Sequence, residues 1–220
     1  YQKEKELATA YQAHALAFWP DGSVKWLALA AVLGPQDGER FTVAQGASPP
    51  PEKPVSHDRV GIEVFRRVRT GAMTCDVGDR GIFFIQAIER DGRFACGGAS
   101  LVCRLGQRRD KSGRRVRVTE NCVGLIRKVS FEQSGPVRLV VRLEGVHRGE
   151  LSGRLWLPSV LRLTFFAGLD EVRLSHTIVY DGRAEEDFIA GLGVRCHVPL
   201  EGDAHNRHAR FAGETGGVWS

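Results

Sequence analysis

The chain has 220 residues, of which 42% are hydrophobic, enough for one large or two small domains with a buried core. No apolar run approaches the roughly 20 residues of a membrane-spanning helix, which argues against an integral membrane protein. The favoured explanation of the net charge of +5 is a basic surface without a specific partner. The sharper alternative is affinity for an anionic polymer, because arginine, which outnumbers lysine here, binds carboxylates in a bidentate manner.

Nucleic acid and membranes are not expected partners. The sequence shows no basic helix, no zinc-finger spacing and no basic–aromatic motif of the RNA-binding kind. The first residue is Tyr1 rather than Met, and residues 1–12 lack the apolar core of a signal peptide. We therefore expect a segment of a longer chain.

The cysteines are five in number, with no CxxC pair. Their spacing fits neither a zinc site nor a dense disulfide framework. We expect most of them to be small buried hydrophobic residues, with room for one disulfide whose partners the spacing does not identify. They are Cys75, Cys96, Cys103, Cys122 and Cys196.

Residues 10–32 predict two strands around the turn formers of residues 20–23. In the second strand, Trp26 lies on one face and Leu27 on the other, so we expect both faces to be covered. For Trp19 and Trp26, packing in a core is favoured over contact with a ligand, because large aromatic residues are usually interior anchors.

A proline-rich stretch, ASPPPEKPVSHDR, occupies residues 47–59. It is typical of an extended linker and is the best candidate for a domain boundary. The sequence therefore predicts a small N-terminal domain at residues 1–46, the linker, and a larger domain at residues 60–220.

Short apolar runs at even spacing fill the larger domain, with no convincing helix between them. The clearest pattern is Val160–Gly182, in which apolar and polar residues alternate on both sides of a break at Gly168–Asp170. This period of two predicts a β-hairpin, which needs a second sheet to be stable. The fold class that follows is all-β, an antiparallel β-sandwich. The other predicted strands are residues 62–67, 72–76, 81–88, 100–105, 115–119, 124–132, 137–146, 153–157, 188–198 and 208–212.

Two histidines are considered as core or catalytic residues: His176 lies in a predicted strand, and His147 directly follows one. For His176, on the inner face of the hairpin, a hydrogen-bonded place in the core is favoured over a catalytic base. His147, at the end of a strand, fits either role.

The richest polar cluster lies near the C-terminal end. It combines Arg and His for an anionic ligand with Asn for hydroxyl groups, and ligand contact is about as well supported as an exposed loop. Its HxxH spacing lacks the glutamate of HExxH, so a zinc protease is unsupported. The cluster consists of His205, Asn206, Arg207, His208 and Arg210.

No complete catalytic set is present. The GxSxG motif, the P-loop, the dinucleotide fingerprint, the kinase motifs and the EF-hand are all missing from the sequence. The sequence therefore predicts no catalytic residue, no metal ligand and no cofactor in this chain.

Several stretches, taken in order, resemble one family. FWPDGSVKWLAL resembles a signature of the N-terminal RIFT-barrel domain of exo-rhamnogalacturonan lyase-like (YetA-like) proteins. SGPVRLVVRLEGVH, LRLTFFAGLDEVRLSHTIVYDG, DFIAGLGVR and HNRHARFAGETGGVW are similar to the central β-sandwich domain of the same family. The resemblance implies that the small β-barrel-like domain of residues 1–46 is truncated.

The resemblance also implies a function for the longer protein. Such proteins combine the barrel, the sandwich and a C-terminal α/α toroid, and cleave rhamnogalacturonan, a pectic polymer, by β-elimination. We expect most catalytic groups on the toroid, so no catalytic residue is assigned here. Arg207, His208 and Arg210 are residues of the type that neutralises a uronate carboxylate.

Two functions follow as expectations. The first is a non-catalytic front portion of a polysaccharide-lyase-like protein, a scaffold for the toroid of the same chain that also lines part of its substrate cleft. The second is a stand-alone carbohydrate-binding or structural interaction module. The expected partner is an acidic pectic polysaccharide or oligosaccharide, which slightly favours a secreted or periplasmic location.

Overall fold

The computed structural model describes residues 9–34, 42–43, 46–60, 65–107, 118–200, 202–207, 211–212 and 218–219. Within these ranges the chain forms strands and one short 3-10 helix, η1 (Ala204–Asn206). The strands up to the middle of the chain are β1 (Tyr11–Phe18), β2 (Val24–Ala31), β3 (Ser56–Val60), β4 (Phe65–Arg69), β5 (Met73–Gly78), β6 (Phe83–Arg90) and β7 (Arg93–Gln107). The later ones are β8 (Val118–Ser134), β9 (Arg138–Gly149), β10 (Leu155–Phe166), β11 (Arg173–Ile178), β12 (Asp187–His197), β13 (Phe211–Ala212) and β14 (Val218–Trp219).

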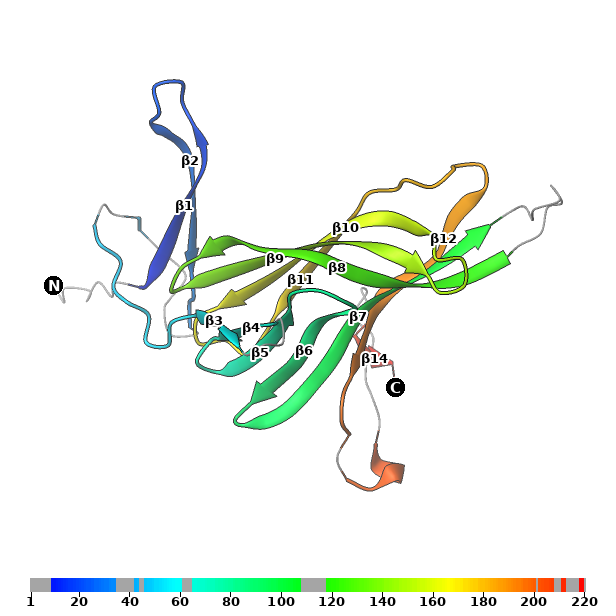
Figure 1. Ribbon diagram of the computed structural model, residues 1–220. Coiled ribbons are helices and arrows are strands. Elements are labelled where there is room, and N and C mark those ends of the chain that lie inside the picture. The colour runs from blue at the N-terminus through cyan, green and yellow to red at the C-terminus, as the bar shows by residue number, and fades with distance from the viewer. Residues whose placement is uncertain are drawn as a thin grey trace.

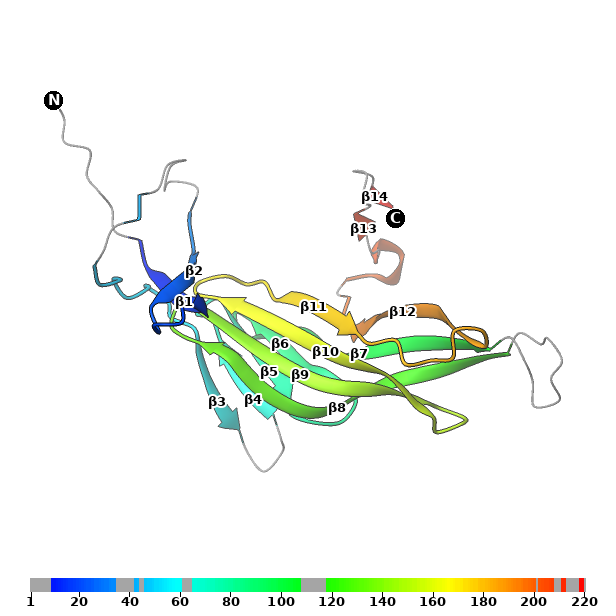
Figure 2. The same ribbon diagram turned by 90° about the horizontal axis from the view of Figure 1, so that it is seen from above.

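The central domain is a sandwich of two antiparallel layers, as the sequence predicts. One layer has the order β3-β4-β5-β6-β7-β12 and the other has the order β8-β9-β10-β11. The layers are continuous at one end, where residues 102–107 of β7 pair with residues 118–123 of β8. Figures 1 and 2 show β8, β9 and β10 stacked on β5, β6 and β7.

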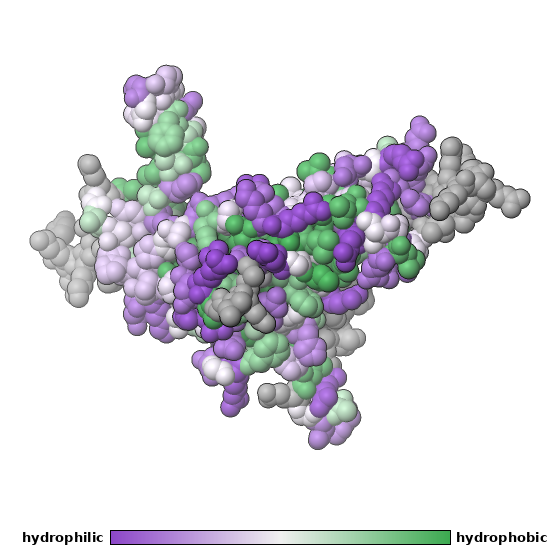
Figure 3. Space-filling view, in the orientation of Figure 1, coloured by the Kyte–Doolittle hydropathy of each residue, from purple (hydrophilic) through white to green (hydrophobic). Residues whose placement is uncertain are grey.

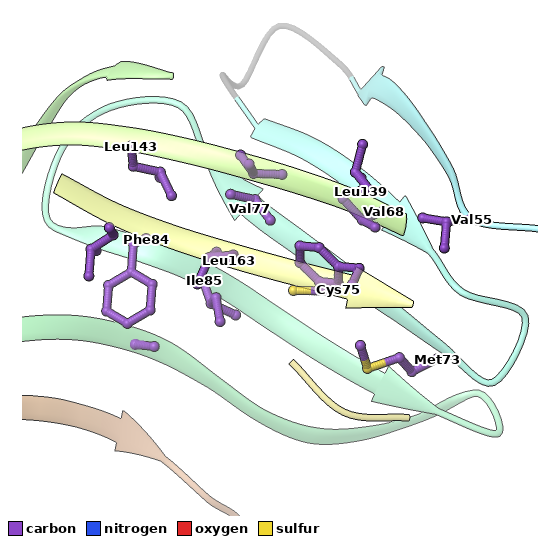
Figure 4. Close-up of a cluster of buried hydrophobic side chains, with 14 of the residues drawn as sticks. Val55, Val68, Met73, Cys75, Val77, Phe84, Ile85, Leu139, Leu143 and Leu163 are labelled. Atoms are coloured by element: carbon purple, nitrogen blue, oxygen red, sulfur yellow. The ribbon is translucent and has the colours of Figure 1, made fainter. Parts of the chain in front are cut away.

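The main core lies between the layers because the strands alternate as expected. Leu143 of β9, Leu163 of β10 and Val77 of β5 are fully buried and belong to one cluster of apolar side chains (Figure 4). Each such side chain contributes roughly 1.5–3 kcal/mol on burial. A second, smaller cluster contains Cys103, Leu105, Cys122, Trp156 and Leu157, from β7, β8 and β10.

The hairpin predicted at Val160–Gly182 is present as β10 and β11. Leu161 is the partner of His176 and Leu163 is the partner of Leu174, in an antiparallel register. The turn is fixed to the other layer, because Thr70 Oγ1 donates a hydrogen bond of 2.6 Å to the Leu169 carbonyl. The hairpin thus closes one side of the sandwich rather than standing alone.

Hairpin β1–β2 projects from the sandwich (Figure 1) and its surface is largely apolar (Figure 3). Trp26 is 63% exposed and Leu27 is 53% exposed, so the expectation that both faces are covered is wrong for the described residues. Trp19, at 51% exposure, is not a core residue either. Two strands alone have no second layer to cover them.

The first strand of the sandwich begins inside the proline-rich stretch of residues 47–59. Residues 56–60 form β3, which pairs with β4. Val55 is buried, and its N–H donates a hydrogen bond of 2.8 Å to the Pro136 carbonyl. Sheet pairing therefore starts before the predicted end of the linker.

All five cysteines are free thiols. Cys75, Cys103 and Cys122 are buried, in line with the expectation of small hydrophobic residues, while Cys196 is exposed. Burial raises the pKa of Cys103 to about 12, so this thiol stays protonated at neutral pH. Among the described residues, no helix has the length and apolarity required to span a bilayer.

Candidate functional site

The structure brings three of the five predicted site residues together on one exposed turn. The chain leaves the sandwich after β12, and His205 and Asn206 form part of η1 (Figure 1). Arg207 follows, and its Nε donates a hydrogen bond of 2.9 Å to the Gly202 carbonyl. His208 and Arg210 lie outside the described residues. Ligand binding by this cluster stays a prediction.

The charged outer face of β8–β10 is tied together by ion pairs. Arg162 of β10 binds Glu132 of β8 in a bidentate manner, at 2.8 and 2.9 Å. Arg142 of β9 contacts Glu144 at 2.8 Å and Glu132 at 3.6 Å. The hydrogen bond from Arg162 lowers the pKa of Glu132. These guanidinium groups are therefore already occupied by carboxylates, and an anionic polymer would have to compete for them.

A second basic cluster surrounds an aromatic ring at the end of β10. The guanidinium of Arg138 lies 5.7 Å, and that of Arg173 5.1 Å, from the ring centroid of Phe166. Arg173 is mostly exposed and also contacts Glu171 at 3.1 Å. An aromatic ring beside guanidinium groups suits an acidic sugar, because the ring packs on the sugar face and arginine binds the carboxylate. The sequence did not reveal this cluster, because its members come from three strands.

A buried ion pair joins the two layers near β12. The guanidinium of Arg154 donates to both carboxylate oxygens of Asp187, at 2.9 and 2.7 Å, and the Asp187 side chain is fully buried. The backbone N–H of Arg183 and the amide of Gln107 also donate to it. The Arg154 hydrogen bonds lower the pKa of Asp187 to about 2. Because all the hydrogen-bond donors to Asp187 belong to the chain itself, we assign this ion pair a structural role.

Two histidine rings face each other beside the second core cluster. His147 of β9 is fully buried and His176 of β11 is half-buried, with ring centroids 5.9 Å apart. His147 Nδ1 lies 3.1 Å from the Leu157 carbonyl. Neither Nε2 atom has a hydrogen-bond partner, although both atoms are buried. Burial lowers the pKa of both rings, and the neighbouring His147 lowers the pKa of His176 further, so both rings favour the neutral form at pH 7.

The prediction for His176 is therefore confirmed only in part. The residue lies on the inner face, but its Nε2 is not satisfied as a core histidine normally is. The sequence could not reveal the pair, because sheet pairing through β10 is what brings β9 and β11 into register.

Comparison with protein families covers both parts of the chain. The PcRGLX-like N-terminal RIFT barrel domain matches residues 1–46. The PcRGLX-like protein central beta sandwich domain matches residues 62–220. The chain belongs to the PcRGLX-like family. The barrel and sandwich assignment and the YetA-like resemblance are thereby confirmed.

One curated relative extends this result. The chain is 40% identical over 205 residues to the uncharacterized protein YetA of Bacillus subtilis (strain 168). The alignment covers 93% of this chain but 24% of YetA, so the chain spans about a quarter of the length of this relative. Hairpin β1–β2 lies within the barrel-domain match, and β4–β14 lie within the sandwich-domain match.

Proposed function

We propose that this chain is the non-catalytic front portion of a rhamnogalacturonan-lyase-like protein. It acts as a scaffold for a C-terminal α/α toroid and contributes basic side chains to the wall of the substrate cleft. The observation that carries the proposal is the tandem match of a RIFT barrel and a central sandwich in a chain about a quarter as long as YetA. The self-paired charges on β8–β10 also favour a structural role for that face.

The chemistry of β-elimination defines what the cluster at residues 205–210 would contribute. A base removes the proton at C5 of the uronate, and an acid protonates the leaving oxygen. Neutralising the uronate carboxylate makes the C5 proton more acidic, and preorganised cations do this best. Such groups are supplied by Arg207, His208 and Arg210. In the sequence, these residues follow the point at which the chain leaves the sandwich.

The test uses the protein encoded by the complete reading frame around this sequence. Replacing both Arg207 and Arg210 with Ala should lower kcat/KM for rhamnogalacturonan at least tenfold, because the transition-state carboxylate loses its cations. Arg93→Ala, an exposed arginine at the start of β7, is the matched control and should leave kcat/KM unchanged. Equal activity of the double variant and the control would refute the role of the cluster.

The scaffold part of the proposal has its own readout. The 220-residue chain alone should release no unsaturated product, which is followed by its ultraviolet absorbance. Product formation by this chain would overturn the non-catalytic assignment. Removal of the sandwich from the complete protein should abolish activity, and the remaining part should no longer unfold cooperatively. A remaining part that is still active would rule out a scaffold role.

A second candidate function, a carbohydrate-binding module, is favoured by the exposed aromatic residues. Phe18, Trp19 and Trp26 are all more than half exposed on hairpin β1–β2. Phe166, beside Arg138 and Arg173, offers a further ring with cations. A module predicts that the isolated chain binds rhamnogalacturonan oligosaccharides in calorimetry, and that Arg173→Ala weakens binding while Arg93→Ala does not. Absence of binding favours the scaffold.

A further inference from the structure

We propose that His147 and His176 together bind one monovalent copper ion, Cu(I), through their Nε2 atoms. The pair involves different residues from the basic clusters of β8–β11, and the proposal does not depend on the lyase-like function. It starts from two imidazole rings 5.9 Å apart whose Nε2 atoms are both buried and unpartnered. Buried polar atoms in native proteins nearly always have partners, so this arrangement calls for one.

The protonation state of His147 is fixed by its other nitrogen. A carbonyl oxygen only accepts hydrogen bonds, so at 3.1 Å from the Leu157 carbonyl Nδ1 must carry the proton. Nε2 then presents a bare lone pair. Metal-binding histidines characteristically use this arrangement, in which one ring nitrogen donates to a backbone carbonyl and the other binds the ion.

The backbone at Leu157 is bent in a way that serves this contact. Leu157 has a φ of 48° and lies where the register of β10 against β9 shifts, between Trp156 and Ser159. Such a conformation costs a non-glycine residue about 1–2 kcal/mol. The neighbouring segment holds it in place, because the Leu157 N–H donates to Asp181 Oδ1 at 2.7 Å and the Val179 N–H to the Pro158 carbonyl at 2.8 Å. The result is a carbonyl aimed at His147.

The ligand set favours a monovalent ion. Among the described residues, no group of three or more His, Cys, Asp or Glu side chains converges on one point. Zn(II) normally takes four ligands, and a doubly charged ion held by two neutral imidazoles would be costly to bury. Cu(I) carries a single charge, and two nitrogen donors in a line satisfy its coordination. With metal–nitrogen bonds of about 2 Å, two imidazoles bound in a line to one ion have centroids roughly 6 Å apart. The centroids of His147 and His176 are 5.9 Å apart, which fits this arrangement.

The position of β11 leaves an entry route for the ion to His147 and His176. β11 is the edge strand of its layer, paired with β10. His176 is half-buried on it, while the neighbouring inner-face residue Leu174 is 40% exposed. An ion therefore meets His176 first, at the margin of the sandwich, and His147 behind it.

The experiment follows the histidine ring nitrogens by NMR during anaerobic titration with Cu(I). Cys96 and Cys196 are replaced with Ser beforehand, because these less buried thiols would compete for the ion. We expect the Nε2 resonances of His147 and His176 to shift together at one equivalent. His176→Asn should weaken Cu(I) binding at least 100-fold, whereas His14→Asn, at an exposed histidine of β1, should leave it unchanged.

A measurement on the chain that lacks only the Cys96 and Cys196 thiols, with both histidines in place, guards against a histidine variant that fails to fold. X-ray absorption at the copper edge should show two nitrogen donors and no sulfur. Shifts confined to exposed histidines, sulfur ligation, or Nε2 resonances that do not move would overturn the site. Tighter binding of Zn(II) than of Cu(I) would overturn the assignment to a monovalent ion.

Discussion

The sandwich and hairpin β1–β2 are built from the same kind of strand, yet they differ in what covers them. Phe165 of β10 is fully buried between two layers, whereas Phe18 of β1 is 60% exposed. Both are large apolar side chains in strands of mostly apolar sequence. An apolar sequence can therefore form a strand, but its side chains are buried only where a second layer covers them. Among the described residues, no second layer covers the apolar side chains of the hairpin, whereas the two layers of the sandwich cover its main core.

Replacing each phenylalanine with alanine tests directly whether the two regions differ in burial. Phe165→Ala should lower the free energy of unfolding by about 3–5 kcal/mol, because it removes buried surface and leaves a cavity. Phe18→Ala should change it by less than about 0.5 kcal/mol, as for other surface substitutions. Urea unfolding followed by circular dichroism measures both. Similar losses for the two variants would mean that the hairpin is covered in solution, and the contrast would fail.

The ion pair Arg154–Asp187 tests the sandwich through its electrostatics. Asp187→Asn should destabilise the fold by roughly 3 kcal/mol, because it leaves the partly buried guanidinium without its partner. The exposed pair of Arg69 and Asp58, at 2.9 Å, is the matched control, and Asp58→Asn should cost less than about 1 kcal/mol.

The same pair gives the sandwich a pH dependence. The pKa of Asp187 is about 2 in the folded chain and 3.8 ordinarily, so the folded state holds the proton less tightly than the unfolded state. Its contribution, about 2 kcal/mol by linkage, is full above the ordinary value and is lost as the pH falls from about 4 to 2. The stability gap between the chain and its Asp187→Asn variant should narrow over this range in urea unfolding. A constant gap down to pH 2 would contradict the assignment.

The sequence predicts the sandwich better than its details. Leu161, Leu163 and Phe165 alternate strictly, and β10 pairs with β11 as expected. The predicted break near Pro158 is not a strand end, because the bulge between Trp156 and Ser159 accommodates the proline and β10 continues through it. Local pattern alone cannot show such a bulge.

The candidate sites were less accessible to sequence reasoning, for a physical reason. His205 and Arg207 stand close in sequence, so their proximity on the exposed turn could be predicted. The contact between His147 and His176 depends on the register of three strands, which no local pattern encodes. The exposure of Trp26 could not be predicted either, since an apolar residue in a strand reveals nothing about which layer covers it.

The attachment of the hairpin to the sandwich is the finest test of the comparison. Gln12 Oε1 of β1 accepts a hydrogen bond of 2.9 Å from the Arg138 N–H of β9. Gln12→Ala should loosen the hairpin by about 1 kcal/mol, the usual net value of one hydrogen bond. Amide exchange in β1 and β2 should then accelerate about fivefold while exchange in β9 and β10 stays unchanged, because the hairpin opens independently of the core. His14→Ala, at an exposed position of the same strand, should accelerate neither. If exchange in β10 accelerated as much as exchange in β1, the hairpin and the sandwich would form one cooperative unit. The lack of a second layer would then not explain why the apolar side chains of the hairpin are exposed.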